Sequence, residues 1–227
     1  MGEMVEFPSN GSNGQGYLAV APDGGPGVVV IQEWWGLVPH ITELCDRFAA
    51  AGFTALAPDL YRGEQTTEPD EAGKLMMALN LDRAAKDMSG AVDFLRGHDG
   101  VTSEGVGVVG FCMGGGLALV LACRRPDAVV ACAPFYGLIP WEGAQPDWSA
   151  LAAPVRGHYA ENDGFFGPEA VAGLQATLDG LGKDAVLEVH PGVDHAFFND
   201  HRPEVYDAVE ATKAWDATTA FFRDAVR

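Results

Sequence analysis

Three residue types that together support nucleophilic catalysis follow one another along this 227-residue chain. Cys112 lies in residues 110–114 (GFCMG), which have the form glycine, any residue, nucleophile, any residue, glycine, and Asp163 and His195 come later. In this order a histidine takes the proton of the nucleophile and an acid orients the histidine. The residue types therefore predict attack of a thiolate on a carbonyl carbon.

The segment around Cys112 stands between two regular elements. Residues 106–109 (VGVV) predict a buried strand, and residues 114–125 predict a helix rich in small residues. A tight strand-to-helix turn needs small flanking residues, and it exposes the nucleophile beside a helix N-terminus that stabilises negative charge. A glycine-rich turn around a buried cysteine is the structural alternative.

Asp163 and His195 also follow predicted strands, at residues 155–159 and 186–190. Reactive groups of open α/β sheets lie beyond the carboxyl ends of the strands. The order and the three junctions together favour the catalytic interpretation of Cys112.

Strands and helices alternate along most of the chain. This alternation predicts an α/β class fold, a single domain over residues 1–227 with a mostly parallel central sheet and helices on both faces. The first two strands have no helix between them, so we expect them to be antiparallel at one edge. The predicted strands are residues 4–7, 16–21, 27–32, 53–57, 106–109, 128–133, 155–159 and 186–190, and the predicted helices lie within 41–49, 71–96, 114–125, 168–181 and 204–223.

The composition excludes several classes of protein. The 14 basic and 32 acidic side chains give a formal net charge of -18, which disfavours nucleic acid and anionic membrane surfaces as partners. Four cysteines are too few for a disulfide framework, so Cys45, Cys123 and Cys132 are expected to pack in the core. Residues 1–10 show no signal-peptide pattern, which favours a cytoplasmic protein. We expect a monomer or a weak homo-oligomer that needs no cofactor.

The sequence resembles the dienelactone hydrolases, a branch of the α/β-hydrolase fold with a cysteine nucleophile. The resemblance runs from Gly27 to the terminal helix, and its most specific segments are residues 32–36 (QEWWG), 57–61 (APDLY), 110–115 (GFCMGG) and those around Asp163 and His195.

The resemblance implies a role for each matching residue. Cys112, Asp163 and His195 would form the triad, and Glu33 would help to control ionisation of the thiol. The backbone N–H groups of Met113 and Trp34 would form the oxyanion hole. The implied reaction is hydrolysis of an ester or lactone through a thioacyl enzyme.

Aromatic residues stand beside the reactive ones and predict an apolar substrate pocket. We expect the substrate to contact Trp35, Phe111, Tyr136, Phe197 and Asn199. Core packing is the alternative for the aromatic members of this set.

Residues 190–201 crowd several possible metal ligands together. His190, Asp194, Asp200 and His201 surround His195, but their spacing matches no established ligand motif, so we expect no metal site.

Two arginines that hold the carboxylate of a dienelactone in the family are missing here. Asn199 stands four residues after His195, and residues 66–73 contain no arginine or lysine, which leaves Arg202 as a shifted substitute. The alternative function is therefore a carboxylesterase or thioesterase acting on a less acidic substrate. A non-catalytic ligand-binding or redox-responsive protein, with Cys112 as a sensor thiol, is the third alternative.

Overall fold

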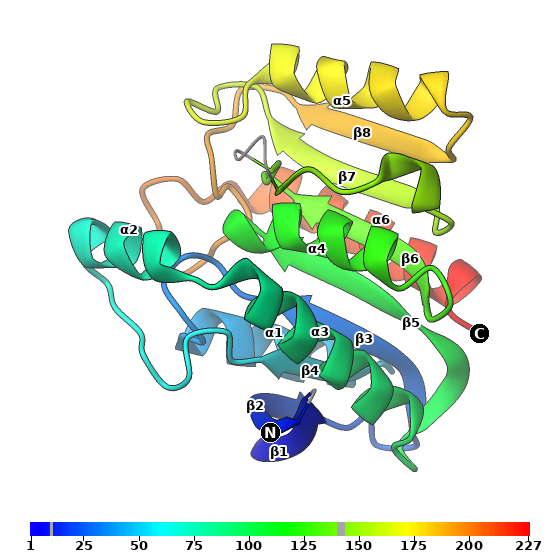
Figure 1. Cartoon of the computed structure of the whole chain (residues 1–227). Coiled ribbons are helices and arrows are strands. Elements are labelled where there is room, and N and C mark those ends of the chain that lie inside the picture. Colours follow the sequence, from blue (N-terminus) through cyan, green and yellow to red (C-terminus); the bar gives the residue numbers. More distant parts are fainter. Residues whose placement is uncertain (10, 140–143) are drawn as a thin grey trace.

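A single eight-stranded sheet runs through the computed structural model, which describes residues 1–9, 11–139 and 144–227 (Figure 1). The strand order is β1-β2-β4-β3-β5-β6-β7-β8, with β1 and β2 antiparallel and β3 to β8 parallel. The strands are β1 (Glu3–Ser9), β2 (Ser12–Ala19), β3 (Gly25–Ile31), β4 (Thr54–Pro58), β5 (Val101–Phe111), β6 (Val129–Phe135), β7 (Val155–Ala160) and β8 (Ala185–His190).

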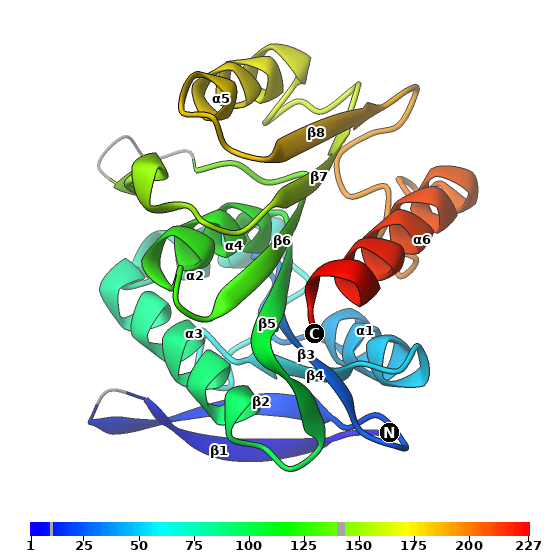
Figure 2. The same cartoon turned by 90° about the vertical axis from the view of Figure 1, so that its right-hand side faces the viewer.

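Helices cover both faces of the sheet (Figure 2). α1 and α6 pack on one face, and α3, α4 and α5 pack on the other, so each face has its own apolar core. In the described part of the chain, no helix has both the length and the apolar character to cross a membrane. The helices are α1 (Pro39–Ala50), α2 (Pro69–Ala78), α3 (Leu81–Arg96), α4 (Met113–Arg124), the short η2 (Trp148–Ala150), α5 (Pro168–Gly180) and α6 (Ala208–Ala225).

The parallel sheet, the helices on both faces and the antiparallel edge confirm the sequence-based expectations. The central strands are almost wholly apolar because both of their faces are covered: every residue of β4 is buried, as is every residue of β5 from Gly105 to Phe111.

Several element boundaries differ from the prediction, and two of them have a clear physical reason. β5 begins at Val101 rather than at residue 106, because Ser103 interrupts the apolar pattern while its hydroxyl accepts from Gly27 N at 3.0 Å and donates to Gly105 O at 2.7 Å. α6 begins at Ala208 rather than at residue 204, because the Asp207 side chain caps the helix there.

The parallel strands all end at one edge of the sheet. The residues that follow β3, β5, β6, β7 and β8 along the chain therefore meet there, although they are far apart in sequence. They include Glu33, Cys112, Tyr136, Asp163 and His195, in that order of strands.

Candidate active site

Cys112 occupies the turn between β5 and α4 in a left-handed backbone conformation, with φ 55° and ψ -119°. The turn is tight: a Cβ on Gly110 would lie 2.0 Å from Gly114 O, and one on Gly114 would lie 2.4 Å from Ile31 O. The two glycines are therefore a steric requirement of the turn, and a strained non-glycine residue between them is typical of functional sites.

Asp163 and His195 are joined by a 2.7 Å hydrogen bond between Asp163 Oδ2 and His195 Nδ1. The other carboxylate oxygen, Oδ1, accepts from the backbone N–H groups of Phe165 at 2.7 Å and Phe166 at 3.0 Å. Both oxygens of the buried carboxylate are thus engaged, which fixes its orientation and that of the imidazole ring.

The ionisation of this pair is shifted from the usual values. Burial disfavours the charged imidazole, but hydrogen bonds to Asp163 and Cys112 outweigh it and raise the pKa of His195 to about 10. Burial likewise opposes the charge on Asp163, but the hydrogen bond with His195 outweighs it and lowers the pKa of the carboxyl. At neutral pH the imidazole therefore holds a proton beside the sulfur.

Glu33 lies at the end of β3 with 1% of its surface exposed. Its Oε2 accepts from Asn199 Nδ2 at 2.9 Å, while within the described residues Glu33 Oε1 and Tyr136 Oη have no hydrogen-bond partner. Burial raises the pKa of Glu33, and the positive charges of His195 and Arg202 oppose that rise. A buried carboxylate is thus held near the candidate triad.

The two backbone groups expected to bind an oxyanion lie on neighbouring elements. Met113 is the first residue of α4, where N–H groups have no acceptor within the helix. Trp34 follows Glu33 beyond β3, and the close approach of Gly114 to Ile31 O and Gln32 O brings that end of β3 to the first turn of α4. Trp34, Cys112 and Met113 all line the same cavity.

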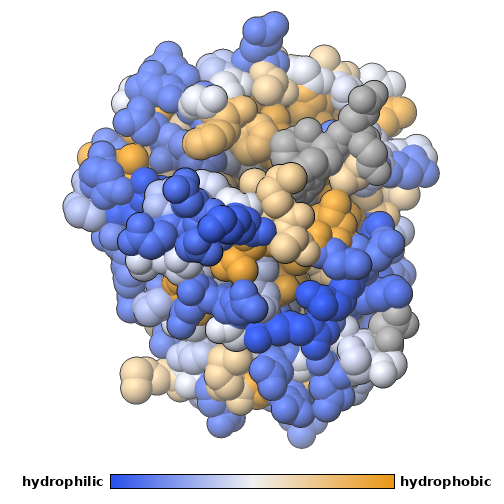
Figure 3. All heavy atoms as spheres, turned by 60° about the vertical axis from the view of Figure 1, so that its left-hand side comes forward, coloured by the Kyte–Doolittle hydropathy of each residue, from blue (hydrophilic) through white to orange (hydrophobic). Residues whose placement is uncertain are grey.

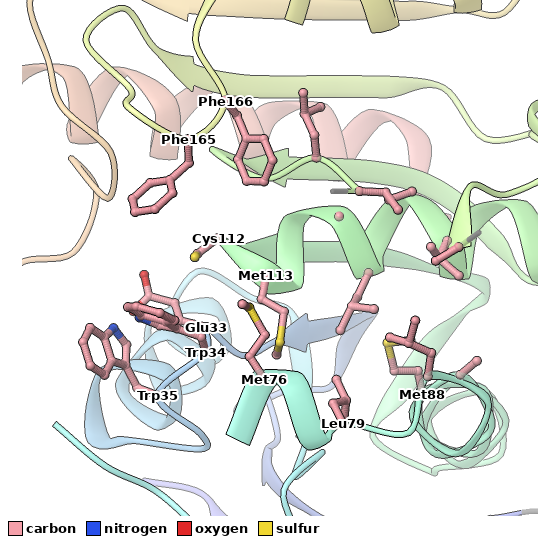
Figure 4. A pocket seen from close by; sticks show the side chains of 18 of the residues that line it. Glu33, Trp34, Trp35, Met76, Leu79, Met88, Cys112, Met113, Phe165 and Phe166 are labelled. Carbon is pink, nitrogen blue, oxygen red and sulfur yellow. The ribbon is translucent and has the colours of Figure 1, made fainter. Parts of the chain in front are cut away.

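This cavity has a volume of about 870 Å³. Figure 3, which brings the α2 side forward, shows apolar side chains gathered in the middle of one face between hydrophilic margins. Figure 4 shows Phe165 and Phe166 on one side of Cys112, and Trp34, Trp35 and Glu33 on the other. Cys112 and His195 therefore open on an apolar cavity.

Four of the expected substrate contacts lie behind the cavity wall and not in its lining. Phe111, Tyr136 and Phe197 are buried in an aromatic cluster under the candidate triad, and the side chain of Asn199 donates a hydrogen bond to Glu33. Phe111, Phe197 and Asn199 are close to Cys112 or His195 in sequence and Tyr136 follows β6, but these positions put the side chains under the site and not at its surface. Trp35, by contrast, lines the cavity.

Most of the residues that line the cavity have no distinguishing pattern in the sequence. Phe165 and Phe166 follow Asp163 in a loop, and the other members lie on helix faces that a pattern of apolar spacing assigns to the core. Among the apolar lining residues not expected are Met76, Leu79, Leu81, Ala85, Met88, Leu117, Val120, Leu138 and Ile139.

Arg202, the possible substitute for the two missing carboxylate-binding arginines, also lines the cavity. Its guanidinium carbon lies 5.9 Å from the centre of the Trp35 ring, and its Nε donates to Glu204 Oε1 at 2.9 Å. Among the described lining residues, Arg124 is the other arginine, and it lies at the far end of α4.

The histidines of residues 190–201 are close in sequence but have different partners in the structure. His190 contacts Glu210 at 2.8 Å and His158 at 3.0 Å, His201 contacts Glu43 at 2.9 Å, and His195 turns to the cavity. Among the residues that the structure describes, two groups have ligand atoms close enough for one metal ion, and none of their members lines the cavity: His40, Asp200 and His201, and His158, Glu188 and His190. Hydrogen bonds within the protein account for the buried pair of His158 and His190.

Comparisons with known proteins agree along nearly the whole chain. The sequence model of the dienelactone hydrolase family matches residues 14–226. Protein usf of Aquifex pyrophilus is 41% identical over 230 residues, covering 99% of each chain. A protein of Aquifex aeolicus named "Putative carboxymethylenebutenolidase" is 38% identical, covering 98% of each chain.

Comparison with solved structures supports the same assignment of the fold. The crystal structure of a "Putative Dienelactone Hydrolase" from Klebsiella pneumoniae subsp. pneumoniae is similar with a TM-score of 0.88 and 27% identity, covering 98% of each chain. The resemblance noted from the sequence and the α/β-hydrolase fold are thus confirmed. The chain belongs to the dienelactone hydrolase family and is a hydrolase of the dienelactone hydrolase type.

Proposed function

We propose that this protein hydrolyses a carboxylic ester or lactone through a triad of Cys112, His195 and Asp163 and a thioacyl-enzyme intermediate. One observation carries the proposal: His195, bonded to Asp163 at 2.7 Å, lines the same cavity as the cysteine of the strained turn. A base, its orienting acid and a nucleophile that share one cavity form the arrangement that acyl transfer requires.

In the first half of the reaction, the thiolate of Cys112 attacks the carbonyl carbon and forms a C–S bond, and the carbonyl oxygen takes up the electron pair. The N–H groups of Met113 and Trp34 are suited to stabilise this oxyanion. The intermediate then collapses, the C–O bond breaks, and His195 gives its proton to the leaving alcohol.

In the second half, water attacks the thioester carbonyl while His195 accepts a proton from that water. Collapse of the second oxyanion releases the carboxylic acid product and restores the thiolate beside a protonated His195. Asp163 remains ionised throughout and holds the imidazole in one orientation. Its lowered pKa supports this role.

The lining of the cavity supports a substrate less acidic than a dienelactone carboxylate. Arg202 is the one arginine near Cys112 among the described lining residues, and Glu204 already accepts a hydrogen bond from it. The net charge of -18 also slows the approach of anions. We therefore infer that neutral esters are the better substrates and that the binding partner is a small molecule.

The test is hydrolysis of p-nitrophenyl acetate and of a dienelactone by the wild type and by Cys112→Ala. We expect the substitution to lower kcat/KM at least a thousandfold, because nucleophile and base act as a unit. Cys123→Ala is the matched control, since Cys123 is a buried thiol outside the cavity lining, and it should retain the activity.

Equal activity of the wild type and Cys112→Ala on every ester would overturn the proposal. If Cys112 reacts with oxidants while no ester is hydrolysed, the redox-responsive alternative takes its place. Hydrolysis of the dienelactone at the rate of the aryl ester would contradict the preference for neutral substrates.

A further inference from the structure

One face of α4 forms a wall of the cavity along the whole length of that helix. Met113, Gly116, Leu117, Val120 and Arg124 line the cavity at spacings of three and four residues. An α-helix rises 1.5 Å per residue, so this wall extends for about 16 Å from Met113 to Arg124. The cavity is therefore a long groove that begins at the nucleophile.

The opposite wall comes from α2 and α3. Met76 and Leu79 lie at and just beyond the end of α2, and Leu81, Ala85 and Met88 follow one face of α3. From Met113 to Val120 on α4, every described lining residue is apolar or glycine. The first charged side chains at the far end are Arg124 and Asp82, whose atoms approach to 3.7 Å. The apolar part of the groove ends at this ion pair.

The position of the groove relative to His195 decides whether the groove receives the acyl part or the alcohol part of an ester. His195 must lie at the leaving oxygen to protonate it, so the leaving group occupies the His195 side and the acyl substituent points away. The ring of His195 lies 5.1 Å from that of Phe165, which places His195 on the Phe165 side of Cys112. α4 runs away from Cys112, and Figure 4 shows Met113, Met76, Leu79 and Met88 leading away from Cys112 on the side opposite Phe165 and Trp35. The groove therefore continues on the acyl side.

Building on the function proposed above, we propose that the groove between α3 and α4, hereafter the acyl groove, binds a linear apolar acyl chain of the ester substrate. An extended chain of single bonds advances about 1.2 Å per bond, as the ~3.6 Å reach of a three-bond peptide unit indicates. About 16 Å then corresponds to about 13 bonds, so the acyl groove takes a chain of about 12 to 14 carbons, and the Arg124–Asp82 pair sets the limit.

The first test is kcat/KM for p-nitrophenyl esters from acetate to hexadecanoate. Each buried methylene should raise kcat/KM roughly three- to fourfold up to about 12 to 14 carbons, after which the increase stops. Val120→Phe, which places a ring about two-thirds of the way along the acyl groove, should lower the decanoate-to-acetate ratio of kcat/KM at least tenfold. Met77→Phe is the matched control, because Met77 is an exposed residue of α2 outside the lining, and it should leave the profile unchanged.

A flat or falling profile, or equal losses on all esters in Val120→Phe, would overturn the assignment. A second result would also overturn the assignment: kcat/KM rises with the length of the alcohol chain in n-alkyl acetates but not with the length of the acyl chain. That result would put the apolar chain on the His195 side.

A binding measurement separates this proposal from the proposed function. Decanoate should bind Cys112→Ala at least tenfold more tightly than butyrate in calorimetric titrations, and Val120→Phe in the same background should abolish the difference. Equal binding of the two carboxylates overturns the acyl groove even if acetate esters are hydrolysed. Chain-dependent binding supports it even if hydrolysis proves independent of Cys112.

Discussion

Asn199 donates a hydrogen bond of 2.9 Å to Glu33 and so joins two buried side chains that are 166 residues apart in sequence. Asn199 stands where the family resemblance leads one to expect an arginine, and an amide cannot neutralise a carboxylate as an arginine does. Glu33 is left with one oxygen that has no partner among the described residues. A buried, incompletely solvated carboxylate destabilises the folded state.

Glu33→Gln is accordingly expected to stabilise the fold. Burial raises the pKa of Glu33 above its usual 4.5, so the unfolded chain releases this proton at lower pH than the folded chain does. The stability that Glu33 contributes is present below pH 4.5 and is lost as the pH rises through the raised pKa. The glutamine retains an acceptor for Asn199 and carries no charge. We expect it to add about 1–2 kcal/mol to the free energy of unfolding at pH 7.5.

Urea unfolding at pH 4.5 and at pH 7.5 measures this difference. The gain in the free energy of unfolding of Glu33→Gln over the wild type should be small at pH 4.5 and larger at pH 7.5. Glu64→Gln, at an exposed position, is the control and should show no such trend. A loss of stability at pH 7.5 in Glu33→Gln would mean that the carboxylate makes favourable contacts beyond the bond to Asn199.

The pKa of His195 should fall when either of its partners is changed. Hydrogen bonds to Asp163 and to Cys112 raise it to about 10. Cys112→Ala removes one contribution and Asp163→Asn the other, so each variant should titrate at a lower pH than the wild type. The chemical shifts of the imidazole nitrogens across pH 5 to 11 give all three values. An identical titration in Cys112→Ala would show that the thiol does not interact with the ring.

Gly110→Ala tests the turn that carries Cys112. The added Cβ would lie 2.0 Å from the backbone oxygen of Gly114, which cannot move without displacing the start of α4. We expect a loss of about 3 kcal/mol or more in the free energy of unfolding. Gly173→Ala is the matched control, because Gly173 lies within α5 and a Cβ there meets nothing within 4 Å. That variant should gain ~0.5–1 kcal/mol, and equal stabilities of the two variants would contradict the steric argument.

The buried His158 should account for part of the loss of folding stability at acid pH. Burial and the neighbouring His190 lower the pKa of His158 to about 3, so the ring stays neutral when folded but is protonated in the unfolded chain below about pH 6.5. Stability should therefore decline as the pH falls from 6.5 towards 3. His158→Gln should make that decline shallower by about 1 kcal/mol per pH unit, measured by urea unfolding at pH 6.5, 5.5 and 4.5. If the free energy of unfolding falls equally with pH in the wild type and in His158→Gln, His158 does not contribute to the decline.

The sequence was informative where local sterics and burial act together. The glycines around Cys112 and the apolar runs of β3, β4 and β6 are dictated by contacts within or beside the element, so their patterns predict the elements directly. The order of strands also predicts that Cys112, Asp163 and His195 share one edge of the sheet.

The lining of the cavity was not predictable in the same way. An apolar helix face such as that of Leu117 and Val120 has the same spacing whether it meets another helix or an empty groove. Phe165 contacts the site because the backbone of its loop is bonded to Asp163, a tertiary contact that has no sequence period. Phe111, by contrast, is next to the nucleophile in sequence but points from a strand into the core, since neighbouring strand residues face opposite sides.

The residues of the proposed triad are divided between the centre and the border of the sheet. Cys112 follows β5, which has strands on both sides, whereas His195 follows β8, the last strand in the sheet order, whose residues are largely half-exposed. Border strands open before central ones do. On gentle heating the general base should therefore separate from the sulfur while most of the sheet persists. Such a molecule would keep its circular dichroism spectrum and lose its catalytic power, so thermal inactivation of this protein should begin below its melting temperature.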